Sequence, residues 1–153
     1  MSHPSDPRLD RITRAFDGAF LRMCAASVEE DVHAELSNAL SQFYRLSELC
    51  KKKLGDDAYY QALTSSDNLR TAGAIVWART FDTHDAIAMS QLGDRVSDYF
   101  TEMFSVPVWR SLSHLPNPYD KYGRHLDYQE LLEGRIVLDT IRPSFDALFE
   151  LVS

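Results

Sequence analysis

The chain has 153 residues, 44% of them hydrophobic, which is enough apolar surface for one domain over residues 1–153 with a real core. Its net charge of −7 gives no general attraction to nucleic acid or to an anionic membrane, so a phosphate ligand would need a local cluster of cations. The sequence has no apolar run long enough for a membrane span and no signal-peptide core. We therefore expect a cytoplasmic protein, no membrane partner, and free thiols at Cys24 and Cys50.

The first third of the sequence predicts two amphipathic helices. Apolar residues recur at spacings of three and four over 7–25, and again over 28–54. The second segment begins with acidic residues and ends in three lysines followed by Gly55, which suits the helix dipole and a C-terminal cap. The short connection favours an antiparallel hairpin. Residues 1–6, ahead of these helices, are expected to be disordered.

Two shorter helices are expected next, over 56–63 and 68–77. In the second, Gly73 and Trp77 share a face, which permits a close helix contact or a homodimer interface. The apolar pattern pauses over 79–85 and resumes over 87–104, where we expect a further helix.

The last third predicts a loop and two more helices. Several prolines and tyrosines make residues 106–125 a long loop. A short helix over 126–132 follows, and then a last helix capped by Asp139 with Pro143 in about its first turn. Residues 136–138 also fit a strand, although no partner strand is evident. The fold class is therefore all-α, a bundle of five or six helices with one long loop.

The polar segment between the two apolar segments contains the strongest candidates for functional residues in the chain. Its sequence is Arg-Thr-Phe-Asp-Thr-His, from Arg79 to His84. On one unbroken helix these two side chains would lie about 140° apart and would not share a face. Asp82 or Thr83 can be an N-cap, and Asp85 suits the first turn of a restarted helix. For Arg79 and His84 to meet one ligand, the helix must break here or a second subunit must complete the site.

Arginine and histidine together suit phosphodiester chemistry. A neutral imidazole at His84 can act as a general base on a ribose 2′-hydroxyl, while the guanidinium of Arg79 can hold a phosphate. The positive end of a helix favours the neutral imidazole, whereas Asp82 and Asp85 favour the charged form. These groups suffice in principle for RNA cleavage without a metal or another cofactor.

An arginine followed after four residues by a histidine, between helical segments, resembles the motif of the HEPN superfamily of small all-α domains. The resemblance covers residues 7–104. It implies an RNase of the toxin or defence type, a homodimer, and a protein partner such as an antitoxin. It also implies that Arg79 stabilises the phosphate and that His84 is catalytic. The residue after the arginine is Thr80, where the superfamily prefers Asn, Asp or His.

A non-catalytic interpretation of the same residues stays open. Arg79 can pair with Asp82 or another acid while His84 packs or caps, which would leave a helical interaction or dimerisation module without enzymatic activity.

Two other polar groups are weaker candidates. Glu30 and His33 form a Glu-x-x-His pair of the kind that holds di-metal centres, but the sequence has no second such pair, so we predict no metal site. Arg124 and His125 would line the Arg79 cleft if the long loop folds back over the helices.

Overall fold

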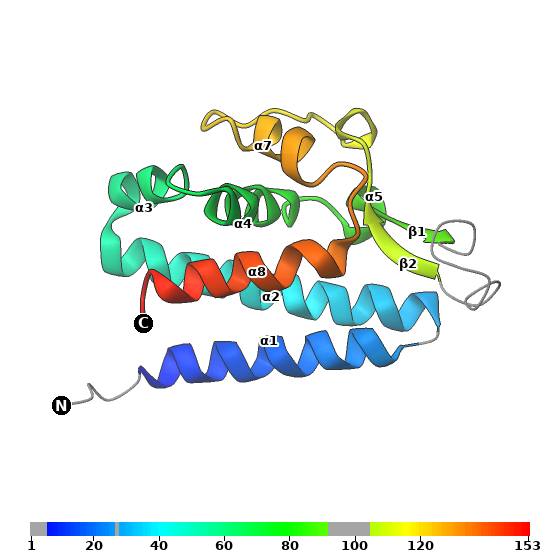
Figure 1. The fold of residues 1–153 in the computed structure, drawn as a ribbon, viewed down its shortest axis with the longest axis horizontal. Coiled ribbons are helices and arrows are strands. Elements are labelled where there is room, and N and C mark those ends of the chain that lie inside the picture. The colour runs from blue at the N-terminus through cyan, green and yellow to red at the C-terminus, as the bar shows by residue number, and fades with distance from the viewer. Residues whose placement is uncertain (1–5, 27, 92–104) are drawn as a thin grey trace.

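The computed structural model describes residues 6–26, 28–91 and 105–153. These residues form seven α-helices and one two-stranded ribbon, so the predicted all-α bundle is confirmed. Figure 1 shows α1 and α7 at opposite edges of the molecule, with α2, α4 and α8 between them. Among the described residues, no helix is both long enough and apolar enough to cross a membrane.

Helices α1 (Pro7–Ala25) and α2 (Glu29–Leu54) form the predicted antiparallel hairpin. The first begins at Asp6, whose carboxylate accepts a hydrogen bond of 2.9 Å from the Arg8 backbone. Of the residues expected to be disordered, 1–5 lie outside the described part, whereas Asp6 is fixed as this N-cap. The second helix ends at Gly55, whose φ of 86° lies in the region that favours glycine.

Helix α8 (Val137–Glu150) packs against this hairpin and contacts α2 directly, and Figure 1 shows it above α1. The ring of Phe145 stacks on that of Phe16 at 3.8 Å between centroids and meets Phe43 edge-on at 5.6 Å. All three rings are buried. One aromatic residue from each of three helices therefore joins them in a common core.

Helices α3 (Asp56–Ala62) and α4 (Asp67–Ala78) follow, and α4 is almost entirely buried. A Cβ atom on Gly73 would lie 3.1 Å from the Leu63 side chain, and Trp77 is only 4% exposed. The Gly73–Trp77 face, which we expected to permit a dimer, is therefore used inside the chain. The reason is that α4 lies at the centre of the bundle, in contact with α2, α7 and α8.

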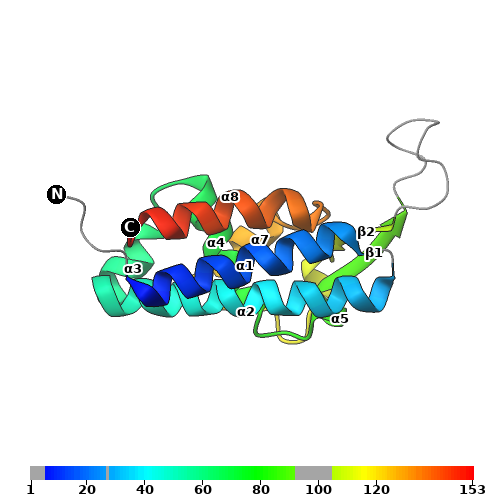
Figure 2. The ribbon, with the colours of Figure 1, turned by 90° about the horizontal axis from the view of Figure 1, so that it is seen from below.

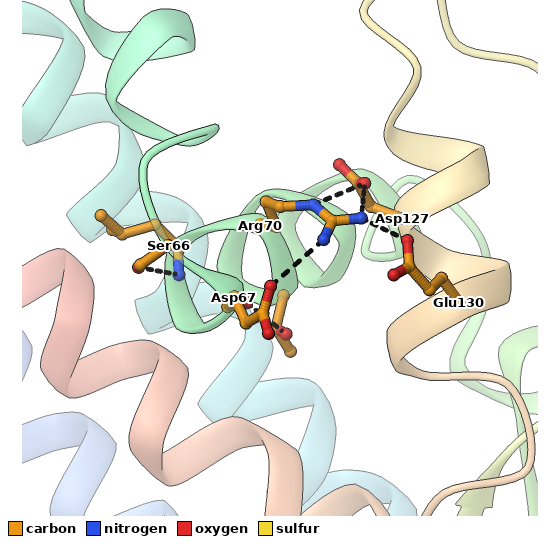
Figure 3. A network of polar contacts seen from close by, with 7 residues as sticks. Ser66, Asp67, Arg70, Asp127 and Glu130 are labelled. Atoms are coloured by element: carbon orange, nitrogen blue, oxygen red, sulfur yellow. Dashed lines mark hydrogen bonds and ion pairs between the residues drawn. The ribbon is translucent and has the colours of Figure 1, made fainter.

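Arg70 of α4 forms ion pairs with helix α7 (Arg124–Leu131), as Figure 3 shows. Arg70 donates from Nε and Nη2 to Asp127 Oδ1, at 3.1 and 2.9 Å, and its Nη2 also donates to Glu130. Its Nη1 donates to Asp67 at 3.2 Å. A single guanidinium thus joins three carboxylates from two helices.

The prediction of a helix over 87–104 is wrong for its first residues. Residues Ile87–Gln91 form strand β1, which pairs antiparallel with β2 (Ser105–Trp109), and residues 92–104 lie outside the described part. The long loop expected over 106–125 therefore begins too early, because residues 106–109 belong to the partner strand. Beyond it, residues 110–123 carry only the short 3-10 helix Leu112–His114, as expected of a long loop.

Helix α8 also begins earlier than expected, at Val137 with Ile136 as its N-cap rather than Asp139. Pro143 therefore lies inside the helix and not in its first turn. The strand considered for 136–138 is reduced to one bridge between Ile136 and Val108. This contact to β2 fixes the chain just ahead of α8, and the buried Val137 then begins the helix.

Candidate functional site

The helical path is broken between Arg79 and His84, one of the two arrangements that the sequence permits. Helix α4 ends at Ala78 with Arg79 as its C-cap. Asp82 is then the N-cap of the short helix α5 (Thr83–Ala86), and its Oδ1 accepts a hydrogen bond of 2.8 Å from the His84 backbone. The restart at Asp82 thus leaves both Arg79 and His84 exposed.

His84 has an aromatic partner that sequence reasoning did not identify. Its ring lies against that of His33 on α2, with 4.1 Å between centroids and 30° between planes. His84 is exposed, whereas the side chain of His33 is only 6% exposed. The backbone of His84 is also held from the other side, because its carbonyl accepts a hydrogen bond of 3.2 Å from Arg110 Nε. The outer imidazole is therefore positioned on a buried one.

The environment of His33 favours its neutral form. Burial lowers the pKa of His33 below its usual value and the adjacent His84 lowers it further, while Glu29 and Asp82 oppose this shift. Glu29 lies one turn before His33 on α2, and its Oε1 is 3.7 Å from His33 Nε2. His33 Nδ1 is buried and has no hydrogen-bond partner in the described part of the chain. A neutral imidazole accordingly lies beneath the exposed one.

Arg79 is engaged elsewhere on α2. Its guanidinium carbon lies 4.4 Å from the centroid of the Tyr44 ring, and both side chains are exposed. No ion pair within the described ranges joins Arg79 to Asp82, although the sequence allows one. The planar guanidinium is thus presented on an aromatic face, with its donors available to a ligand.

Arg79 and His84 do not converge on one point within the chain. Their partners on α2, Tyr44 and His33, are eleven positions apart, which is about 16 Å at 1.5 Å per residue. Eleven steps of about 100° also bring the helix back to nearly the same face. The two residues therefore mark the two ends of one strip along α2 rather than one catalytic point.

A small polar cavity of about 210 Å³ lies between α2 and the turn that follows α4. Arg79, Asp82 and Thr83 line it from the turn, and Ser37 and Ser41 line it from α2, together with Leu40 and Phe81. Figure 2 shows α5 beside α2, where this strip runs. Three hydroxyl groups, a carboxylate and a guanidinium thus line this cavity, and His33 and Tyr44 flank it on the same face of α2 without lining it. We call the cavity together with these flanking positions the α2 cleft.

The α2 half of this cleft has a signal in the sequence. His33, Ser37, Ser41 and Tyr44 recur at spacings of four, four and three, which puts them on one helical face. The Glu30–His33 pair was the wrong pattern for this histidine, because the structure pairs it with Glu29. Within the described ranges, no group of three or more His, Cys, Asp or Glu side chains is arranged to hold a metal ion.

The remaining predicted residues serve other contacts. Asp85 is exposed, and its backbone N–H donates to the Asp82 carbonyl at 3.0 Å. Arg124 pairs with Asp120 at 3.0 Å, and His125 Nδ1 accepts from the Asp120 backbone, so this cluster secures the start of α7.

Both cysteines are free, as expected. Burial raises the pKa of Cys50 to about 11 and also raises that of Cys24. Thiols with raised pKa values are poor nucleophiles at neutral pH, so neither is a candidate for covalent catalysis.

No protein-family model, curated protein or solved structure matches this chain. A function for this chain is therefore inferred from the geometry of the α2 cleft.

Proposed function

We propose that the chain is an endoribonuclease that cleaves single-stranded RNA without a metal ion, with His84 as its general base and His33 as the residue that positions it. The observation that carries this proposal is the exposed imidazole of His84, stacked at 4.1 Å on the buried imidazole of His33. The RNase activity and RNA substrate implied by the HEPN resemblance agree with it. The roles differ, because Arg79 belongs to a separate end of the cleft.

The chemistry follows from the two imidazoles. Neutral His84 takes the proton of a ribose 2′-hydroxyl, and the freed oxygen attacks the adjacent phosphorus. The bond to the 5′-oxygen breaks, that oxygen takes a proton from water, and His84 returns its proton to solvent. The products are a 2′,3′-cyclic phosphate and a 5′-hydroxyl. His33 is a positioning residue that supports the ring of His84 from below.

Arg79 and Tyr44 form the distal end of the proposed RNA site. Single-stranded RNA is recognised through bases stacked on aromatic rings or guanidinium planes and through phosphates bound by arginine. A distance of about 16 Å from the histidine pair exceeds one nucleotide step, about 3.4 Å in a stacked strand. We therefore expect a short RNA segment to lie along this face, with the cleaved bond at the histidine end and a bound nucleotide at the Arg79 end.

The test is cleavage of end-labelled single-stranded RNA in EDTA by wild type, His84→Ala and His114→Ala. His114 is an exposed histidine in the 3-10 helix after β2, and it is the matched control. We expect loss of at least 100-fold in rate for His84→Ala, which is the usual contribution of a general base, and no change for His114→Ala. Equal cleavage by all three proteins would remove the histidine pair from the mechanism.

The competing function is a non-enzymatic interaction module, and one observation favours it. Leu21 and Val28, on either side of the turn between α1 and α2, are 68% and 53% exposed. Exposed apolar side chains near the connected ends of α1 and α2 suit a protein partner or a second copy of the chain. Absence of RNA cleavage, together with loss of self-association or partner binding in Leu21→Ser, would support this function instead.

A further inference from the structure

We propose that the groove between α1 and α2 binds an organic phosphate, meaning a phosphate monoester carried on an apolar group. This site is separate from the α2 cleft, because Arg45 in the groove lies about 120° around α2 from His33. The groove has a volume of about 680 Å³, within the range of small-molecule sites. Phosphate binding in this groove does not depend on RNase activity at the α2 cleft.

The charge of the groove is opposite to that of the chain. Arg8, Arg11, Arg45 and Lys52 line it, although the net charge of the protein is −7. Arg8 pairs with Asp6 at 3.1 Å, but no ion pair in the described residues involves the other three cations. The groove therefore presents positive charge that these carboxylates do not neutralise.

The acidic residue of the lining does not cancel this charge. Glu48 lies at the groove, but its carboxylate accepts a hydrogen bond of 3.3 Å from Lys51, which is not among the lining residues. Arginine and lysine together suit a phosphate group, the first through its planar fork of donors and the second as a point charge.

The inner surface of the groove suits the organic part of such a ligand. Ile12 and Leu49 are among its lining residues and are 8% and 5% exposed. Gln42 also lines the groove, and its Oε1 is buried without a hydrogen-bond partner in the described part of the chain. Buried polar atoms are normally paired. Because this atom is closed to water, a ligand would reach the amide only after the side chain turns, and the turned amide would donate to a phosphate oxygen.

The test uses isothermal titration calorimetry of the full chain with phenyl phosphate and with inorganic phosphate. We expect phenyl phosphate to bind at least tenfold more tightly than inorganic phosphate, because only phenyl phosphate also covers Ile12 and Leu49. The double variant Arg45→Gln/Lys52→Gln should weaken its binding at least tenfold. The matched control, Arg135→Gln/Lys121→Gln, removes the same charge from exposed positions outside the groove and should bind within twofold of wild type.

A soluble compound and a lipid headgroup both supply this chemistry, and co-sedimentation with vesicles separates them. Sedimentation with phosphatidic acid vesicles, lost in Arg45→Gln/Lys52→Gln, would identify the lipid as the source. Binding of phenyl phosphate without sedimentation would identify a soluble compound. Absence of phenyl phosphate binding, equal binding of inorganic phosphate, or equal weakening in the control variant would overturn the proposal.

Discussion

The His33–His84 stack places a titratable side chain where burial opposes its charge. The imidazole of His33 is 6% exposed, its Nδ1 is unpaired in the described chain, and a second imidazole covers it. Glu29 and Asp82 are the acidic groups that oppose the lowered pKa. His33 therefore lies between α2 and the exposed imidazole of His84, in a position where its own positive charge is disfavoured.

The lowered pKa of His33 predicts a pH dependence of stability. Because the pKa of His33 in the folded protein is lowered, its stabilising effect is complete above its unfolded pKa of about 6.5 and is lost as pH falls through the folded pKa. Urea unfolding should therefore show a smaller difference in the free energy of unfolding between pH 7.5 and pH 5 for His33→Gln than for wild type. His114→Gln should retain the wild-type difference, and a His33→Gln protein with that same difference would refute the assignment.

Substitution of Arg79 provides a second test of the proposed RNA site. Arg79→Ala should change the free energy of unfolding by less than about 1 kcal/mol, because an exposed cation on an aromatic ring contributes no more than that. It should weaken the binding of a short single-stranded RNA about tenfold, as expected for loss of a base-stacking position. Fluorescence anisotropy measures the second effect, with Arg135→Ala as control. Unchanged RNA affinity in Arg79→Ala would exclude Arg79 from the site.

At the scale of elements, local patterns predicted more than long-range pairings did. The stripes of α1 and α2 and the cap at Asp82 were predictable, because each depends on residues within a few positions of one another. The strand from Ile87 and the histidine partner of His84 were not, since both require segments far apart in the sequence. The early start of α8 has the same cause, because Ile136 is fixed by its bridge to β2.

The Arg70 network should be the main polar attachment of α7. Arg70→Ala should lower the free energy of unfolding by about 1 to 2 kcal/mol, since its side chain is only 25% exposed and it joins several carboxylates. Amide hydrogens of α7 should exchange faster than those of α1 in the variant. Arg135→Ala, at an exposed position, serves as the control. Unchanged α7 protection in Arg70→Ala would show that apolar packing alone attaches this helix.

Pro143 predicts a stabilising substitution. It lies inside α8 and lacks the N–H that would donate to the Asp139 carbonyl, one turn earlier. Its side chain is exposed, so Pro143→Ala should fit without a clash and should stabilise the fold by about 1 to 2 kcal/mol, after the gain in unfolded-chain entropy is subtracted. Thermal unfolding measures this effect. A lower midpoint for Pro143→Ala would mean that the fold requires a bend at this position.

At the scale of the whole molecule, the two candidate surfaces lie on different faces of α2. The α2 cleft carries histidines, hydroxyls and one guanidinium, while the groove toward α1 carries several cations. The composition alone argued against nucleic acid, because the net charge is −7. The fold places specific groups at specific points instead, and a site of this kind depends on stacking and on general base catalysis more than on overall attraction.

In the proposed reaction, His84 acts on a ribose 2′-hydroxyl. The most direct measurement is cleavage in EDTA of two matched oligonucleotides, one all-RNA and one with a single 2′-deoxynucleotide at the linkage that is cut. We expect the all-RNA strand to yield a 2′,3′-cyclic phosphate and a 5′-hydroxyl, and we expect the 2′-deoxy linkage to resist cleavage. Cleavage of both linkages at the same rate, or of neither, would contradict it.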